Sequence, residues 1–512
     1  MKRLFISLLA LVLCAGAFAQ WQIDPRDYKV SKKDLARARQ ILGARASYGR
    51  AMPVLAAPCG TVSGAPEKLH FLGVDRRATL PAADGNLVFP NPAPGAQWFP
   101  SASLGLFLHW GIHSMLGAQP SWNMIKGYEW GGEYHSRQEY YDQANYFNPQ
   151  DKGFFEKYLG AAREAGFKYA VLTTRHHDGY ALWPSRYGIG VRQYMHGRDL
   201  VREYVDACHA TGMRVGFYFS PRDWHYPGDR PDSEWDVSTW GKRGPVKDTV
   251  RNREDFEKFF AYVLAQLEEL LTNYGKVDLL WLDGMGWYGI PAADLCTEKV
   301  YAWIRSLQPD IVINDRWANI VNPDNPSGTS LRIGDFTTPF ECVKPTYIPS
   351  QWWEHCHIWT GKGGGWGYNT KGVFRPLSWF MEEFVAARSL GGNFLANVGP
   401  SPSGDMHPNF YKEIAALRQW MSWGAESLTD CGPGPGVELS NVPLTARGNV
   451  WYAHLLSGFK GQVSVKTGSA PSSVALLRTG EAVDFIYRDG FLVFRLPASA
   501  REWVDDVVKI TL

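Results

Sequence analysis

The sequence lacks the features that mark nucleic-acid-binding, membrane-spanning and disordered proteins. Its 53 Lys and Arg residues nearly balance 51 Asp and Glu residues, so no clustered basic excess is available to bind a phosphate backbone. After the N-terminal segment, no run of 18 uninterrupted apolar residues could span a bilayer. With 45% hydrophobic and 20% charged residues, the chain can bury a large core and is no coiled coil. We therefore expect no nucleic-acid partner and no membrane span.

Cysteine and metal-binding motifs are equally scarce. No CxxC and no HExxH motif occurs, and we expect no cofactor and no metal. Six scattered cysteines follow the N-terminal segment, and in an oxidising compartment they allow up to three disulfides. Those inside barrel elements, such as Cys208, are expected to be buried free thiols. The six are Cys59, Cys208, Cys296, Cys342, Cys356 and Cys431.

The N-terminus has the pattern of a secretory signal peptide. Lys2 and Arg3 precede an apolar run too short to span a membrane, and Ala17-Phe18-Ala19 is a cleavage signal before Gln20. A lipoprotein interpretation of Cys14 is weak because the bulky Leu13 precedes it. We expect cleavage after residue 19 and a secreted or periplasmic protein.

The rest of the chain divides into three parts that differ in their pattern of apolar and polar residues. Residues 20–97 form an N-terminal extension with one helical stretch at 32–42, and residues 98–430 alternate short apolar runs with amphipathic helices. This alternation predicts an α/β fold, a (β/α)8-like barrel whose site lies at the carboxyl ends of the strands. An open doubly wound sheet is the rival, but no GxGxxG turn follows an early strand. Residues 431–512 read as short alternating strands, which predict a C-terminal antiparallel β-sandwich domain.

The expected barrel elements are read from apolar periodicity. We expect strands at 104–109, 169–174, 214–220, 277–282, 311–314 and 394–398, and helices at 154–165, 200–211, 254–274, 293–307, 377–390 and 409–423. The sandwich strands are expected at 450–455, 462–466, 474–477, 482–488 and 491–496. The stretch 335–368 reads as irregular.

Two strand ends carry side chains suited to chemistry. Asp283 ends the strand Leu280-Trp281-Leu282, where it reads either as a nucleophile or base at the barrel mouth or as a cap. His176 and His177 follow another strand, where they read as hydrogen-bond partners of a polyhydroxy substrate, as metal ligands or as structural residues. Adjacent strand residues point to opposite sides, so a turn is needed to bring both rings inward.

Aromatic side chains beside polar groups form a second pattern. The chain has 22 tryptophans, and His109-Trp110, Glu129-Trp130 and Trp366-Gly367-Tyr368 each pair a stacking ring with a polar group. Such pairs suit the apolar faces and hydroxyl edges of sugars, although core packing is the commoner use of each. Glu341 and Glu354, in the irregular stretch, read as a glycosidase carboxylate pair or as solvated surface.

Taken together, these motifs resemble the signatures of family 29 glycoside hydrolases, the α-L-fucosidases. The resemblance covers roughly residues 98–425, with the motifs in family order. It rests on Leu106–Ile112 with its His-Trp-Gly, Ala165–Gly179, Leu280–Gly284, Asn314-Asp315-Arg316, Trp353-Glu354 before Trp366-Gly367-Tyr368, and Gly391–Pro400.

The resemblance implies a retaining exo-glycosidase that removes terminal α-L-fucose from an oligosaccharide or glycoconjugate. The family nucleophile matches Asp283, and the segment around Glu341 resembles the one that carries the acid/base, with Phe340 as an inserted residue. Glu354 is the rival for that role, and Glu133 rivals Glu129. Arg175 stands where the family usually has lysine, an exchange from which we expect little. The matching sugar contacts are His109, Glu129, Trp130, His176, His177, Tyr218, Trp281, Arg316 and Trp366.

Two other classes of function stay open at this level. A fucose-binding protein with the same site but no competent acid/base would share every motif. A metal-dependent hydrolase using His176 and His177 would need a third ligand, which has no recognisable place in the sequence. In the favoured mechanism, Asp283 must be ionised, and we expect Arg316 and the histidines to depress its pKa.

Overall fold

The computed structural model describes most of the chain. The described residues are 23–43, 88–129, 131–149, 152–227, 235–239, 253–284, 295–317, 333–349, 351–361, 365–435 and 439–512. The predicted signal peptide, Cys59 and Trp130 lie outside these ranges.

Eight parallel strands form a barrel. Their order is β5-β4-β3-β2-β1-β8-β7-β6, and a parallel bridge between Asn314, just after β5, and Phe336, at the start of β6, joins the two edges. The predicted (β/α) barrel is therefore confirmed, and the open-sheet rival is wrong. The strands are β1 (Leu104–Leu108), β2 (Tyr169–Arg175), β3 (Arg214–Phe219), β4 (Leu279–Leu282), β5 (Val312–Ile313), β6 (Phe336–Glu341), β7 (Trp352–Ile358) and β8 (Asn393–Val398).

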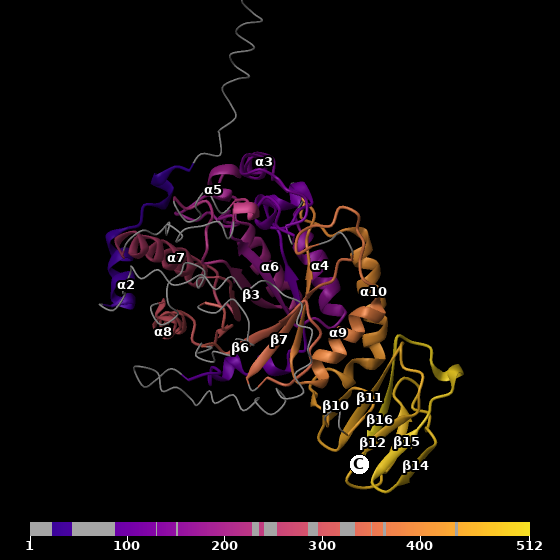
Figure 1. Ribbon diagram of the computed structural model, residues 1–512. Coiled ribbons are helices and arrows are strands. Elements are labelled where there is room, and N and C mark those ends of the chain that lie inside the picture. The colour runs from indigo at the N-terminus through magenta and orange to yellow at the C-terminus, as the bar shows by residue number, and fades with distance from the viewer. Residues whose placement is uncertain are drawn as a thin grey trace, which may run out of the picture.

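Helices surround these strands (Figure 1). Because both faces of the sheet are covered, β1 and β2 are buried along their whole length, and β1 and the first four residues of β2 read as apolar runs. Local signals set the helix ends: the Asp199 side chain accepts from the backbone of Arg202 at the start of α6, and left-handed Gly212 ends it. The helices are α3 (Arg137–Asp142), α4 (Phe154–Glu164), α5 (Val191–Tyr194), α6 (Leu200–Thr211), α7 (Arg253–Asn273), α8 (Thr297–Leu307), α9 (Leu377–Ser389) and α10 (Pro408–Gly424).

Strands β6 and β7 were not expected, and the interpretation of 335–368 as irregular is wrong for them. Their apolar runs are broken by polar residues that the barrel buries, such as Glu354 and His355. Strand β6 also contains Pro339, and its register against β7 shifts between Thr337 and Phe340. Two residues of β6 there face one of β7, which makes a β-bulge. The residue that looked inserted beside Glu341 is thus accommodated by the bulge.

The N-terminal extension packs on the barrel. Helix α2 (Lys32–Leu42) has the predicted bounds, begins with a capping box between Ser31 and Asp34, and lies against α7. Ion pairs of 2.5 and 2.7 Å join Arg37 to Glu268 and Arg39 to Glu257. Just after the extension, at the start of the barrel part, the Phe99 ring lies 4.4 Å from the Phe336 ring within the barrel core. This segment fills the end of the barrel opposite the strands' carboxyl ends.

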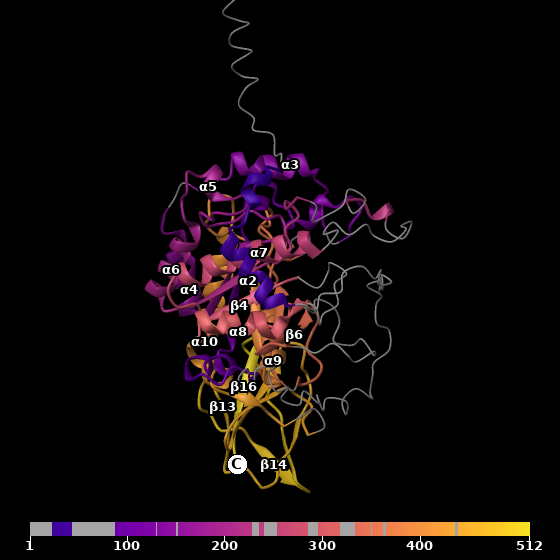
Figure 2. The same ribbon diagram turned by 90° about the vertical axis from the view of Figure 1, so that its left-hand side faces the viewer.

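Two antiparallel sheets form the C-terminal part, which confirms the predicted β-sandwich. It lies beyond α9 and α10 in Figure 1 and below the barrel in Figure 2. The Trp420 indole on α10 donates to the Asp505 carbonyl at 2.9 Å and joins the two parts. One sheet contains β13 (Ser473–Leu476), β16 (Asp505–Thr511), β11 (Val450–Leu456), β10 (Leu444–Arg447) and β9 (Gly432–Pro433), and the other β12 (Val463–Lys466), β15 (Phe491–Phe494) and β14 (Phe485–Arg488).

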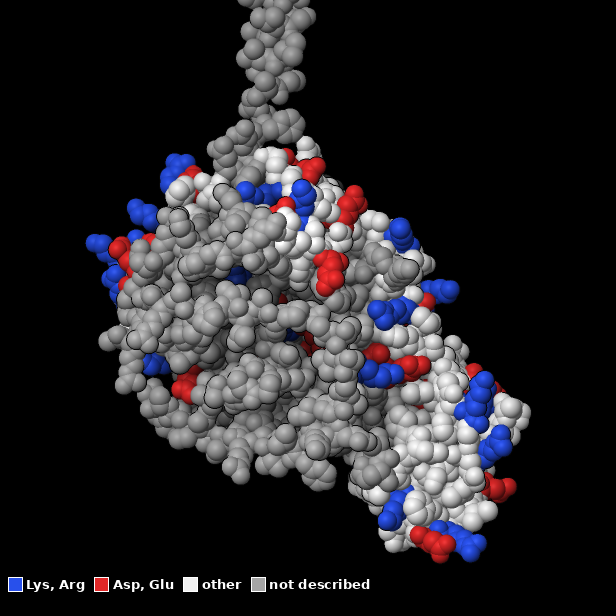
Figure 3. Space-filling view, in the orientation of Figure 1, with Lys and Arg blue, Asp and Glu red and all other residues white. Residues whose placement is uncertain are grey.

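The cysteines and the surface bear on two further expectations. Cys208, Cys342, Cys356 and Cys431 are free thiols, so the buried thiol of Cys208 is confirmed and three disulfides are excluded. Within the described ranges, no helix is long and apolar enough to cross a membrane. Figure 3 shows acidic and basic side chains intermixed on the described part of one face, in keeping with the net charge of +2.

Candidate active site

The carboxyl ends of neighbouring strands bring the predicted site residues together. His109 directly follows β1, His176 and His177 follow β2, and Asp283 follows β4. Tyr218 lies on β3 and points its hydroxyl toward Asp283. Because the strands are parallel and adjacent, residues far apart in the sequence meet at one rim.

Asp283 is the centre of this cluster. Its Oδ2 accepts from the Tyr218 hydroxyl at 2.9 Å and lies 3.9 Å from His177 Nε2, while its Oδ1 lies 3.4 Å from Arg316 Nε. The side chain keeps 16% of its surface exposed, so a substrate atom can reach it.

The expected direction of the Asp283 pKa is wrong. Burial raises the pKa and outweighs Arg316, which lowers it as expected; the nearby Glu341 charge raises it, and the Tyr218 hydrogen bond lowers it. Arg316 therefore offsets part of the cost of holding a carboxylate in a dry site.

His109 presents a hydrogen-bond acceptor to the site. Its Nδ1 lies 2.6 Å from Asn397 Oδ1, and the Asn397 amide nitrogen donates to the Trp366 carbonyl at 2.8 Å. These bonds fix the amide orientation, so Nδ1 carries the proton and Nε2 is left to accept. Burial lowers the pKa of His109 to about 3, which keeps the ring neutral at physiological pH.

A similar series of hydrogen bonds fixes the ring of His177. Its Nδ1 lies 2.6 Å from Ser220 Oγ, whose proton is donated to the Arg222 carbonyl at 2.9 Å. Ser220 Oγ must therefore accept from Nδ1–H. The Nε2 atom of His177, which faces Asp283, then carries the lone pair in the neutral ring.

The turn after β2 brings both adjacent histidines inward. The rings of His176 and His177 lie 4.3 Å apart, and His176 stacks on Tyr218 at 5.4 Å with an interplanar angle of 3°. His176 Nδ1 lies 2.7 Å from Ser121 Oγ. Burial, and then the neighbouring His177, lower the pKa of His176 well below its usual value.

Glu341 is the second carboxylate at the rim. It is the last residue of β6, its side chain is 39% exposed, and its Oε2 lies 2.6 Å from Arg316 Nη1. The same guanidinium contacts Asp283 through Nε. One planar group thus holds both carboxylates close together, one inside the site and one at its edge.

Glu354 lies elsewhere, and its interpretation as a solvated loop carboxylate is wrong. It is fully buried on β7, where its two oxygens accept from the Tyr169 hydroxyl at 2.5 Å and the Trp281 indole at 3.1 Å. Burial raises its pKa to about 7, although both hydrogen bonds lower it. With no exposed oxygen, Glu354 cannot reach a leaving group at the rim.

This buried carboxyl predicts a pH-dependent effect on stability. Because the folded-state pKa is raised, the stability that Glu354 contributes is fully present below its ordinary pKa and is lost as pH rises through about 7. Glutamine mimics the protonated acid, because it is uncharged and has one acceptor oxygen beside an NH2 donor group. We expect Glu354→Gln to match the wild-type Tm near about pH 5 and to exceed it at about pH 8. Thermal unfolding of both proteins tests this, and a Tm difference that does not grow with pH would contradict it.

The predicted aromatic contacts differ in position. Trp366 lies 5.1 Å from the His109 ring, at the site. Trp281 is only 2% exposed and lies beneath Arg316, which packs on it at 4.5 Å. Glu129 and its rival Glu133 are both exposed.

Trp122 and Trp224 were missed as neighbours of the site. Their rings lie 5.5 and 5.2 Å from the ring of His177. Trp224 follows β3 closely, so its place near a strand end was the available signal. Trp122 comes from a loop after β1 and carried no such signal.

The charged residues that flank His176 and His177 in the sequence, Arg175 and Asp178, support the site through buried hydrogen bonds. Arg175 is fully buried and donates to the Tyr262 hydroxyl at 2.8 Å and to the carbonyls of Ser220 and Arg222. These bonds hold the segment that orients His177. Asp178 accepts from the Tyr140 hydroxyl at 2.5 Å, and burial raises its pKa to about 6.

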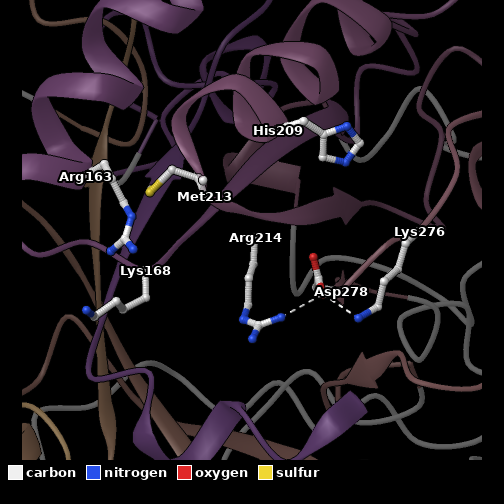
Figure 4. A pocket seen from close by; sticks show the side chains of 8 residues that line it. Arg163, Lys168, His209, Met213, Arg214, Lys276 and Asp278 are labelled. Atoms are coloured by element: carbon white, nitrogen blue, oxygen red, sulfur yellow. Dashed lines mark hydrogen bonds and ion pairs between the residues drawn. The ribbon is translucent and has the colours of Figure 1, made fainter.

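A basic hollow lies at the opposite end of the barrel (Figure 4). Arg214 and Lys276 both reach Asp278 at 3.2 Å, and Arg163 stands in the last turn of α4, where helix carbonyls favour a cation. Burial and then the charge of Arg163 lower the pKa of Lys168 there. Asp278 and the end of α4 thus account for most of these positive charges. The hollow lies at the other end of the barrel from Asp283.

Chelation tests directly whether activity needs a metal bound by His176 and His177. Among the residues that the structure describes, no group of three or more His, Cys, Asp or Glu side chains is placed to hold a metal ion. We expect full activity after prolonged chelation, because His176 and His177 bond to Ser121 and Ser220. Loss of activity that added zinc restores would contradict this and support a metal-dependent hydrolase.

The rim of the barrel gathers two carboxylates, three histidines and several indoles. This combination is typical of a carbohydrate-active hydrolase. Comparison with known proteins agrees, because the α-L-fucosidase family model matches residues 90–426. The chain belongs to the α-L-fucosidase family and is a glycoside hydrolase.

Named relatives and solved structures show the extent of the similarity. The chain is 29% identical to tissue alpha-L-fucosidase of Bos taurus over 385 residues, which is 71% of this chain and 75% of the relative. It is 29% identical to human plasma alpha-L-fucosidase over 352 residues, 65% and 68% of the two chains. The structure of alpha-L-fucosidase isoenzyme 1 from Paenibacillus thiaminolyticus is 27% identical, with a TM-score of 0.65 over 82% of this chain and 99% of that one.

A further solved structure bears on mechanism. It is an alpha-L-fucosidase from Bacteroides thetaiotaomicron, trapped as a covalent intermediate with 2-fluoro-fucosyl fluoride. The two chains are 25% identical, with a TM-score of 0.67 over 82% of this chain and 96% of that one.

Proposed function

We propose that this enzyme is a retaining exo-α-L-fucosidase that removes terminal α-L-fucose from glycans by double displacement. Asp283 is the nucleophile and Glu341 the acid/base. The observation that carries these assignments is the Arg316 guanidinium, which contacts both carboxylates at one rim of the barrel. Retaining glycosidases need two carboxyl groups about 5–5.5 Å apart, a spacing compatible with two oxygens that share one guanidinium.

The chemistry follows from the two environments. Asp283 attacks the anomeric carbon while the glycosidic bond breaks, and protonated Glu341 gives its proton to the departing oxygen. Glu341, now a carboxylate, takes a proton from water, which attacks the fucosyl-enzyme ester and releases fucose and free Asp283. The more exposed position of Glu341 suits the outward-facing leaving group, and the less exposed Asp283 suits the anomeric carbon.

The remaining predicted contacts would orient the sugar. His109, His176 and His177 line the site as hydrogen-bonding rings, and Trp366 offers an indole face beside His109. Tyr218 and Arg316 hold Asp283, and Trp281 supports Arg316 from below. Glu129 and Trp130 stay proposed contacts from the sequence motif.

Activity on a panel of fucosylated oligosaccharides beside an aryl fucoside tests the proposed substrate class. NMR spectroscopy of the first-formed sugar tests the stereochemistry, because retention gives α-fucose before mutarotation. First appearance of β-fucose would show inversion and exclude Asp283 as a covalent nucleophile. A fucose-binding protein without an acid/base would turn over only fucosyl fluoride or aryl fucosides.

We also propose that the protein is exported, to the periplasm or the outside. The support is the charged, apolar and small-residue pattern of the first 19 residues. N-terminal sequencing of the exported protein should begin at Gln20, and an intact Met1 would contradict cleavage.

A further inference from the structure

The carbonyl group next to the proposed acid/base is held by a buried histidine. His355 Nδ1 lies 2.6 Å from the Phe340 oxygen, and Phe340 directly precedes Glu341. This bond lies at the β-bulge, where the regular ladder between β6 and β7 is interrupted. A side chain thus replaces ladder bonding where the backbone turns the Glu341 side chain toward the rim.

The other nitrogen of the same ring is held by a carboxylate on a covering helix. His355 Nε2 lies 2.9 Å from Glu383 Oε2, and Glu383 is on α9. The pKa of Glu383 is lowered: burial raises it, but the hydrogen bond and the charge of His355 outweigh burial. Both ring nitrogens of His355 thus have a partner, one on the backbone of β6 and one on α9.

This arrangement is rigid. The His355 side chain is fully buried and its ring stacks on Phe394 at 5.2 Å with an interplanar angle of 16°. The Phe340 ring packs on Trp353 at 5.3 Å and on Tyr347 at 4.8 Å. The peptide that carries Glu341 is therefore fixed through its carbonyl and the preceding side chain.

We infer that His355 and Glu383 form a positioning pair that fixes the Phe340–Glu341 peptide and aims the Glu341 carboxyl at the leaving-group oxygen. The inference rests on the proposed acid/base role of Glu341. Neither residue touches substrate; each acts through the backbone of β6. Because a misplacement of about 1 Å can cost roughly 100-fold in rate, a device that holds this peptide should affect proton transfer selectively.

Two substitutions of His355 separate its two bonds. The amide nitrogen of asparagine can replace Nδ1, so His355→Asn keeps the bond to Phe340 and loses Glu383. The longer glutamine can replace Nε2, so His355→Gln keeps the bond to Glu383 and loses Phe340. His357→Gln is the matched control, because His357 lies two residues further along β7 and packs against Trp379 at 4.9 Å.

The readout is kcat/KM for a fucoside with a poor leaving group against an aryl fucoside with a good one. We expect His355→Gln to lose about 10- to 100-fold on the poor leaving group and less than about 3-fold on the good one. His355→Asn, which loses only the Glu383 anchor, should show a smaller difference of the same kind, and His357→Gln should show none. A purely structural role would lower both substrates together, because the Asp283 step would suffer as well.

Equal losses on both substrates, or equal behaviour of the Gln and Asn variants at His355, would overturn the inference. If His355→Gln does not fold, Glu383→Ala carries the test, since it removes the anchor of the ring and should give a smaller difference of the same kind. No difference in a folded Glu383→Ala protein would also overturn it. Glu341→Ala is measured in parallel: if it shows no leaving-group dependence, the acid/base assignment itself has failed.

Discussion

Replacing Asp283 with alanine should abolish turnover of every fucoside, by a factor on the order of 1,000 or more, while the protein stays folded. The carboxylate forms the bond to the anomeric carbon from a position that Tyr218 and Arg316 hold. The loss should not depend on the leaving group, because without a nucleophile the first step fails for all substrates. Steady-state rates on aryl and oligosaccharide substrates measure it.

Asp283→Asn is the matched control for this substitution. It keeps the size of the side chain and an acceptor for Tyr218, removes the charge, and should be nearly as inactive. Unchanged thermal unfolding would show that the loss is chemical. Azide placed in the space left by Asp283→Ala should attack directly and give the inverted β-fucosyl azide. Retention of more than about a tenth of wild-type activity by either variant would remove Asp283 from the nucleophile role.

Glu341→Ala should have the second largest effect, and a selective one. A poor leaving group needs the proton, whereas a nitrophenolate departs without it, so we expect about 100- to 10,000-fold loss on oligosaccharides and far less on aryl fucosides in kcat/KM. Azide should restore turnover by attacking the fucosyl-enzyme without base help, and the product should be the retained α-fucosyl azide.

The opposite azide products of the two alanine variants distinguish the two roles. Glu354→Ala is the comparison for Glu341→Ala, because Glu354 is fully buried with both oxygens bonded inside the barrel. It should show neither selective loss nor azide rescue. Equal loss on both substrate types in Glu341→Ala would contradict the acid/base role of Glu341.

The barrel and its rim could be predicted because their signal is local. Apolar runs followed by polar residues marked the strand ends that carry the three histidines and Asp283, and parallel neighbours necessarily end at one rim. Tyr218 was expected from the family resemblance alone. The bounds of α2 were also predicted, because its capping box and apolar spacing lie within one short stretch.

The features that the sequence did not predict depend on tertiary packing. Strand β7 buries Glu354 and His355, each paired with residues from other elements, so its sequence does not read as apolar. The bulge in β6 depends on its register against β7. The pKa of Asp283 rises because burial outweighs Arg316, and burial cannot be read from the residues beside it in the sequence.

Mass spectrometry of the enzyme after reaction with 2-fluoro-fucosyl fluoride tests the nucleophile most directly. The fluorine slows hydrolysis of the fucosyl-enzyme, so the intact mass should increase by one fluorofucosyl group. Fragmentation should place that group on the carboxylate of Asp283. A label on another residue, or an active enzyme that takes up no label and forms β-fucose first, would contradict double displacement through Asp283.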